Sequence, residues 1–148
     1  MAYFQLFYHL ILRTYRSGTT IPEEYEKELY MHIYNYTEKH ECRVYRINGM
    51  PDHVHIFLSI PPKIAISDFV HDMKIATSKS LSYNKHFPDW VGWGESFGVL
   101  SYCIREKEMI INYIKNQKEH HKGISTLEEI MTLYDENQIE YDPKFIQY

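Results

Sequence analysis

The chain is poor in cysteine and has no long apolar run, and each absence excludes a class of protein. Its two cysteines, Cys42 and Cys103, are too few for a disulfide framework, and no Cys-x-x-Cys pair suggests structural zinc or redox chemistry. No segment approaches the roughly 18 apolar residues of a membrane span. The first residues also lack the basic stretch and the cleavage site of a signal peptide. We therefore expect a cytoplasmic protein without a membrane partner.

An excess of basic charge, which would point directly to nucleic acid, is missing as well. The formal net charge is −4, but the acid is concentrated between Ser125 and Tyr148, where six residues are acidic and one is basic. The remainder is nearly neutral, and the chain has fourteen tyrosines and two tryptophans that can stack on unpaired bases. The composition therefore permits a nucleic-acid partner without requiring one.

What the chain does contain is the composition of one folded domain. With 148 residues, 44% of them hydrophobic, it can bury a core, and we expect a single domain over residues 1–148 with an acidic tail from about residue 125. Periodicity and helix signals predict strands at 3–15, 41–47, 53–60 and 99–104, helices at 22–40, 67–83 and 106–122, and a short helix in the tail. This order suggests a ferredoxin-like α+β sandwich, with helices packed on one face of an antiparallel sheet.

The strand at 53–60, HVHIFLSI, carries two histidines one residue apart in an otherwise apolar sequence. Side chains alternate along a strand, so Val54 and Ile56 share one face while His53 and His55 share the other. We expect the apolar face to meet the core and the histidines to lie on the solvent side, about 6.5–7 Å apart at Cα. Two such imidazoles can converge on one cation, although a solvated polar face is the simpler interpretation. Asp52, just before them, suits a turn and can also accept a hydrogen bond from an imidazole.

The helix expected at 106–122 offers further groups for such a site. Tyr113, Gln117 and His121 follow one another at steps of four and therefore share one helical face. An amide oxygen combined with two imidazoles suits a divalent ion such as Mg²⁺ or Mn²⁺. Tyr113, one turn before Gln117, would then point at whatever the metal polarises. Taken alone, this tyrosine is more simply a core aromatic residue.

Together the two motifs resemble those of a known family. The triplet HVH at 53–55 and the sequence YIKNQ at 113–117 are similar to the single-tyrosine HUH transposases of bacterial insertion sequences, of the insertion-sequence-two-hundred type. The segments RINGMPDHVHIFLSIPP and KIATSKSL also match in order and spacing, so the likeness extends over nearly the whole chain. The phrase WVGWGESFGVLSY departs from the shortest family pattern by one or two extra residues. Repeat-associated tyrosine transposases share both motifs and are an alternative.

The resemblance implies a site, a cofactor and partners. Tyr113 would attack single-stranded DNA at hairpin-bearing element ends, which gives a 5′-phosphotyrosine and a free 3′-OH. His53, His55 and Gln117 would hold a divalent metal, Mg²⁺ or Mn²⁺. Family members are homodimers, so composite active sites are expected, in a bacterial protein that works at the nucleoid. The tyrosyl link retains the phosphodiester energy, and the absence of a G-x-x-x-x-G-K-[ST] loop agrees with a reaction that needs no ATP.

Six further residues are expected to contact DNA phosphates or bases, and each of them is also an ordinary surface residue in the simpler interpretation. They are Lys74, Lys79, Trp93, Arg105, Lys115 and Lys118. Three histidines outside the motifs, His9, His120 and His121, can also lie near the site.

Three hypotheses follow, in this order. The first is a DNA-cleaving and DNA-joining transposase, with a repeat-associated transposase in a host role as its variant. The second is a metal-dependent phosphodiesterase in which water attacks and Tyr113 is structural, and the third is a metal-free nucleic-acid-binding module. A covalent protein–DNA adduct separates the first from the second. Loss of activity with a chelator separates both from the third.

Overall fold

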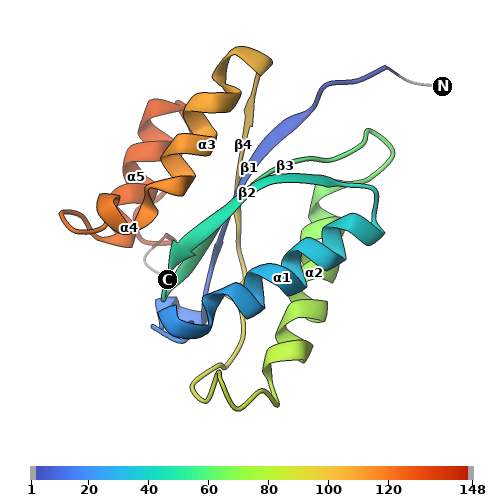
Figure 1. Cartoon of the computed structure of the whole chain (residues 1–148). Helices are drawn as coiled ribbons and strands as arrows, with labels where there is room; N and C mark the ends of the chain where they lie inside the picture. The colour runs from blue at the N-terminus through green and yellow to red at the C-terminus, as the bar shows by residue number, and fades with distance from the viewer. Residues whose placement is uncertain (1–2, 147–148) are drawn as a thin grey trace.

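A computed structural model describes residues 3–146, which form a four-stranded antiparallel sheet with helices (Figure 1). The strands are β1 (Phe7–Arg13), β2 (Arg43–Met50), β3 (His53–Ser59) and β4 (Gly98–Tyr102). They lie in the order β2-β3-β1-β4, and each neighbouring pair is antiparallel. The sequence-based expectation of an α+β fold with an antiparallel sheet is confirmed. The central position of β3 brings its side chains to the middle of the sheet.

One face of the sheet is apolar and is covered by α1 (Glu26–Lys39) and α2 (Ile66–Leu81). Because alternate side chains of a strand share a face, every second residue of β1 and β3 points toward these helices. Each helix buries its own apolar stripe against them. The main core therefore combines strand residues Leu10, Leu12, Val54, Ile56 and Leu58 with helix residues Leu29, Ile33, Phe69, Val70 and Met73.

The opposite face is covered by α3 (Lys107–Lys115), α4 (Gln117–His120) and α5 (Thr126–Glu136), which Figure 1 shows across the sheet from α1 and α2. Two smaller apolar clusters attach them. Phe7 and Phe57 pack against Ile110 and Ile114, and a second cluster joins Ile11 and Leu100 to Ile130 and Leu133. Helices thus cover both faces, whereas we expected them on one. The apolar residues on this second face require a covering layer, since leaving them in water is unfavourable.

The element boundaries differ from the expected ones at several ends. The first strand is limited to Phe7–Arg13, and the helix expected from residue 22 begins as the 3₁₀ turn η2 (Glu23–Tyr25). Two more 3₁₀ turns are η1 (Tyr15–Ser17) and η3 (Ile104–Glu106). The helix expected at 106–122 is broken at Asn116, whose φ of −95° and ψ of 20° are not helical. Within residues 3–146, no helix has both the length and the apolar character that crossing a membrane requires.

Candidate active site

His53 and His55 lie on β3, on the face that α3, α4 and α5 cover. Both side chains have an exposed fraction of 0%, and their ring centroids are 5.0 Å apart. The expectation that they lie on the solvent side is therefore wrong. Residues of α4 and α5 close over this face, so the two imidazoles are a buried pair that points into a helix–sheet interface.

His53 is oriented by groups at the end of its own strand and the start of α5. Its Nδ1 lies 2.7 Å from Asp52 Oδ1. The Thr126 hydroxyl donates to the Asp52 carboxylate, at 2.9 Å from both oxygens. Asp52 thus accepts a hydrogen bond from an imidazole, the role that the sequence left open beside a turn. Because Nδ1 is engaged with Asp52, Nε2 is the ring nitrogen of His53 that faces the interior of the site.

His55 is oriented in the same way by a third histidine, His9 on β1. His9 Nε2 lies 2.7 Å from His55 Nδ1, and both side chains have an exposed fraction of 0%. Antiparallel pairing of β1 with β3 places the two strands side by side, with His9 opposite Phe57 and Ile11 opposite His55. His9 therefore faces the site rather than the polar rim of the sheet. It leaves His55 Nε2 directed away from β1, toward the helices.

Tyr113 and Gln117 reach the histidines from the two sides of the break at Asn116. Tyr113 lies on α3, held by the apolar contacts of Ile110 and Ile114 with the sheet. Gln117 is the first residue of α4, has an exposed fraction of 0% and places Oε1 3.2 Å from His53 Nε2. The Tyr113 ring centroid lies 5.9 Å from that of His55. One chain therefore brings together all four residues that the motifs singled out.

The centre of the site is occupied by Glu129 of α5, which the sequence analysis missed. Its side chain has an exposed fraction of 1%. Oε1 lies 3.0 Å from His55 Nε2 and 3.2 Å from His53 Nε2. The other oxygen, Oε2, accepts hydrogen bonds from the Tyr113 hydroxyl and from Gln117 Nε2, the latter at 2.8 Å. One carboxylate thus touches both histidines, the amide and the tyrosine.

Two more histidines lie beside the carboxylate, one at the end of α4 and one directly after it. His121 Nε2 lies 2.9 Å from Glu129 Oε1, while His120 Nε2 lies 3.7 Å from Oε2 and 3.5 Å from the Tyr113 hydroxyl. The expected step of four from Gln117 to His121 thus brings His121 to the site, although the helix is interrupted. His120 is partly exposed and forms the outer edge of the group.

Burial and neighbouring groups set the charges of the imidazoles. Burial lowers the pKa of His9 well below its usual value and also lowers the pKa of His55, so both rings are neutral near pH 7. Burial acts in the same direction on His53, but hydrogen bonds to Asp52 and Glu129 outweigh it and raise the pKa of His53 to about 9. His53 is therefore protonated near pH 7 and its Nε2 donates to Glu129, whereas His55 is neutral. His53 would have to lose the Nε2 proton in order to bind a metal.

Burial and neighbouring groups also set the charges of Glu129 and Tyr113. Burial acts to raise the pKa of Glu129, but hydrogen bonds from His121, His53 and His55 hold it well below its usual range, so the carboxylate is anionic. Burial raises the pKa of Tyr113, and the adjacent Glu129 carboxylate raises it further. Tyr113 is therefore a neutral phenol whose proton lies on the bond to Glu129.

The donor set fits a divalent metal ion. Ligand atoms from His53, His55 and Glu129 all lie within 4.8 Å of one another. Gln117 adds an amide oxygen beside His53. Imidazole nitrogens combined with carboxylate and amide oxygens suit ions such as Mn²⁺, and buried charges in proteins are commonly paired or bound to metal.

A family model described as "Transposase IS200 like" matches residues 2–117, which is well over half of the chain. The matched range contains the histidine pair and Tyr113, and it ends at Gln117. The chain is an IS200-like transposase. The family core therefore spans the sheet, α1, α2 and α3, while Glu129 and the rest of α5 lie beyond the matched range.

Similar known proteins agree with this family assignment. The IS200-like transposase described here is 28% identical to the ISDra2 transposase TnpA of Deinococcus radiodurans over 123 residues, which are 78% of this chain and 86% of the relative. A crystal structure of a candidate transposase from Deinococcus radiodurans R1 is 26% identical, with a TM-score of 0.59 over 79% of this chain and 95% of that one. A REP-associated tyrosine transposase bound to a REP hairpin has the same TM-score over 84% and 76%, at 13% identity, which shows the fold alone.

The six residues expected to contact DNA occupy different surroundings in the IS200-like transposase. The Lys79, Arg105 and Lys115 side chains are exposed. Lys74 Nζ donates to the carbonyl oxygens of Gly94 and Ser96, and Lys118 Nζ donates to Glu26 and to the Gly49 carbonyl. Trp93 is 9% exposed and donates its indole N–H to Thr77. Lys74, Lys118 and Trp93 therefore already have contacts within the chain.

Proposed function

We propose that this IS200-like transposase cleaves and rejoins single-stranded DNA at insertion-sequence ends through a 5′-phosphotyrosine on Tyr113. The observation that carries the proposal is the convergence of the Tyr113 hydroxyl and the His53 and His55 imidazoles on one small region. A nucleophile and a group of metal ligands at the same place are what metal-assisted phosphoryl transfer requires.

In the proposed reaction the Tyr113 phenol oxygen attacks the scissile phosphorus. The new bond joins that oxygen to phosphorus, and the bond from phosphorus to the 3′ oxygen breaks. The phenol loses its proton, and the departing 3′ oxygen gains one and leaves as a 3′-OH, so the overall change transfers a phosphoryl group without ATP. Attack by the 3′-OH of another strand end on the phosphotyrosine reverses these bond changes and rejoins DNA.

His53, His55 and Gln117 are the proposed ligands of the divalent metal, Mg²⁺ or Mn²⁺. When bound, the ion would polarise the phosphoryl oxygens and offset the developing charge. Asp52 and His9 contact the Nδ1 atoms of the two imidazoles, which leaves each Nε2 directed at the site. The apolar contacts of Ile110 and Ile114 position Tyr113 beside them.

The proposed partner is a single-stranded DNA hairpin at an element end, in the bacterial cytoplasm at the nucleoid. A structural neighbour of the same fold is a transposase bound to a REP hairpin. The exposed residues Lys79, Arg105 and Lys115 are the proposed phosphate contacts. Lys74, Lys118 and Trp93 would have to exchange their present contacts in order to meet DNA.

We also propose a homodimer with composite active sites, in which the segment that carries Tyr113 exchanges its contacts within one chain for the same contacts with the histidine pair of the partner. The test mixes a His53→Ala variant with a Tyr113→Phe variant, each inactive alone, as heterodimers. Restored cleavage supports composite sites. Absence of restoration, or a stable monomer in light scattering at assay concentrations, limits each site to one chain.

The decisive experiment for the proposed function is a denaturing gel with labelled single-stranded hairpin DNA and Mn²⁺. The wild type should form a covalent 5′-linked adduct and should form little with duplex DNA. Tyr113→Phe removes one oxygen and should form no adduct. Tyr134→Phe, a matched change on α5, should keep it.

Two outcomes of the same gel would replace the proposal. Cleavage without any adduct would make the protein a phosphodiesterase in which water attacks. An adduct in Tyr113→Phe would assign the nucleophile to another tyrosine. Adduct formation with repeat-type hairpins alone, and with no element end, would favour the repeat-associated transposase.

A further inference from the structure

We infer that Glu129 is an additional ligand of the divalent metal, an anionic one supplied by a helix outside the matched family range. The inference deepens the proposed function, because it concerns the same metal group as His53 and His55. It assigns a carboxylate to a ligand set in which the sequence pointed only to neutral imidazole and amide groups.

The separations between donor atoms are those of neighbouring ligands on one ion. Ions that hold oxygen ligands at about 2.0–2.1 Å in octahedral geometry separate adjacent ligand atoms by about 3 Å. Glu129 Oε1 lies 3.0 Å from His55 Nε2 and 3.2 Å from His53 Nε2. Gln117 Oε1 lies 3.2 Å from His53 Nε2. The distances from Glu129 Oε1 to the two histidine nitrogens are thus close to the distance from Gln117 Oε1 to His53 Nε2.

Contacts at the two Nδ1 atoms also direct both Nε2 atoms at Glu129. His53 Nδ1 is bonded to Asp52, and His55 Nδ1 is bonded to His9. A ligating histidine in proteins usually has its second ring nitrogen held by such an outer partner. Since the Nδ1 atoms are engaged, both Nε2 atoms face the carboxylate oxygen, and a shared cation between them would satisfy all three groups.

The charge of the site favours a cation. Glu129 is an anion with an exposed fraction of 1%, and burial of a carboxylate is costly unless it is paired or coordinates a metal. Asp52 adds a second anion close to His53. An ion held by His53, His55 and Gln117 alone would have only neutral ligands, whereas Glu129 supplies a negative charge where the ion would lie.

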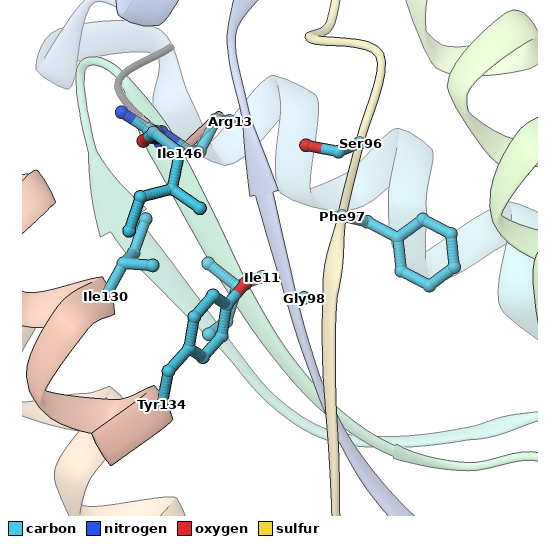
Figure 2. A pocket seen from close by; sticks show the side chains of 8 residues that line it. All are labelled: Ile11, Arg13, Ser96, Phe97, Gly98, Ile130, Tyr134 and Ile146. Carbon is cyan, nitrogen blue, oxygen red and sulfur yellow. Dashed lines mark hydrogen bonds between the residues drawn. The ribbon is translucent and has the colours of Figure 1, made fainter. Parts of the chain in front are cut away.

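The structure of α5 fixes Glu129 at this position. The Ser125 hydroxyl caps the helix by accepting from the Glu128 N–H, and Ile130 and Leu133 anchor the following turns on the sheet. Figure 2 shows Ile130 and Tyr134 of α5 directed at Ile11 and Gly98. A Cβ atom at position 98 would lie 2.6 Å from the Tyr134 hydroxyl oxygen, so glycine permits this close contact. The helix is therefore seated by close packing.

A carboxylate ligand at this place also joins the metal group to the nucleophile. Oε1 faces the histidines while Oε2 accepts the Tyr113 hydrogen bond. Metal binding through Oε1 would hold Glu129 in place, and Glu129 would hold the Tyr113 hydroxyl within reach of a phosphate at the same ion. Glu129 would then be both a metal ligand and the group that positions Tyr113.

The test measures Mn²⁺ binding to the full chain by calorimetry in the absence of DNA. Glu129→Gln keeps the shape and removes the charge, and we expect at least a tenfold loss of Mn²⁺ affinity. The matched control Glu128→Gln alters an exposed neighbour on the same helix and should bind as the wild type does. Tyr113→Phe, which contacts Glu129 without being a ligand, should also keep its affinity. Thermal unfolding in chelator, similar for all four proteins, verifies that each is folded.

The outcomes separate this inference from the proposed function. Wild-type affinity in folded Glu129→Gln would overturn the ligand assignment, even if the adduct gel supports Tyr113. An increase of adduct formation in that variant at unchanged Mn²⁺ affinity would also overturn the ligand assignment. It would indicate that α5 blocks the site until DNA displaces it. Conversely, a tenfold loss in Glu129→Gln supports the inference even if the wild type forms no adduct. If Glu129→Gln unfolds in chelator, Glu129→Met, which removes the carboxylate and keeps an unbranched side chain, is measured instead, and unchanged affinity there would contradict the assignment.

Discussion

The two faces of the central sheet are both buried, but they are built from different kinds of residue. Under α1 and α2, the strands supply mainly aliphatic side chains such as Leu10, Val54 and Ile56. Under α3, α4 and α5, the same strands supply His9, His53 and His55. Because side chains alternate, the seven residues of β3 contribute to both. One strand therefore carries the core on one side and the site on the other.

The comparison shows that burial has a different meaning on each face. On the aliphatic face, stability follows from the volume that is filled, and any apolar residue of similar size serves. On the histidine face each buried nitrogen or oxygen needs a particular partner, and a missing partner leaves an unsatisfied polar group. The aliphatic face therefore tolerates substitutions among apolar residues of similar size, whereas the histidine face depends on the identity of residues that lie far apart in the sequence.

The largest effect is expected from a change on the histidine face that leaves the aliphatic face intact. His55→Ala should abolish strand cleavage and should weaken Mn²⁺ binding by more than the roughly 10–100-fold that loss of an outer partner costs. DNA affinity should largely remain, because phosphate contacts supply most of it. Adduct gels and calorimetry measure the two effects, with the exposed His71→Ala on α2 as control. Undiminished cleavage by His55→Ala would contradict the assignment of His55 as a metal ligand.

The neighbouring residue on the aliphatic face should give the converse result. Ile56→Ala leaves a cavity in the main core and should lower the free energy of unfolding by about 2–5 kcal/mol. Mn²⁺ affinity of the folded protein should not change. Urea denaturation and calorimetry on the same samples check both statements. Weaker Mn²⁺ binding with little loss of stability would show that the two faces are not independent.

A smaller effect is expected when the outer partner of His53 is altered. Asp52→Asn keeps the shape of the side chain but removes the charge that fixes the imidazole, and Mn²⁺ affinity should fall by roughly 10–100-fold. Asp72→Asn, on the exposed side of α2, serves as the matched control. Equal affinities of Asp52→Asn and the wild type would mean that Asp52 is only a turn residue.

The smallest expected effect tests from which side of the sheet DNA approaches. Lys115 is exposed on α3, on the side of the histidines, while Lys79 is exposed on α2, on the other side. Lys115→Ala should weaken binding of single-stranded DNA several-fold and should reduce the salt slope by about 0.7. Lys79→Ala should have the smaller effect if DNA approaches from the side of the histidines. Fluorescence anisotropy over a range of salt concentrations compares them, and a larger effect at Lys79 would place the DNA path on α2.

The sequence predicted the sheet and its two motifs because these depend on local patterns. Alternation in HVHIFLSI assigned the correct residues to each face of β3, and the periodicity of α2 located that helix within two residues. Local patterns do not show what covers a face. Phe7 and Phe57 on the histidine side were the available sign that this face is covered.

Glu129 was missed for a related reason. It lies 12 residues beyond Gln117, in a segment that the sequence analysis described only as an acidic tail with a short helix. Its spacing with Thr126, Ile130 and Leu133 places it in the buried stripe of α5, and a glutamate within an apolar stripe is the signal that was available. Trp93 was expected to contact DNA, but its indole N–H donates to Thr77 and its ring belongs to the main core.

The contact between Gly98 and Tyr134 has a consequence for variation among related chains. A Cβ atom at position 98 cannot coexist with the tyrosine ring as it lies here, because it would meet the hydroxyl oxygen at 2.6 Å. Replacement of Gly98 by a larger residue therefore requires a shifted Tyr134 side chain, a smaller residue at position 134 or a displaced α5. Related chains that keep a C-terminal helix over the sheet should change these two positions together. Those that end soon after the Tyr-x-x-x-Gln motif should accept side chains freely at the position of Gly98.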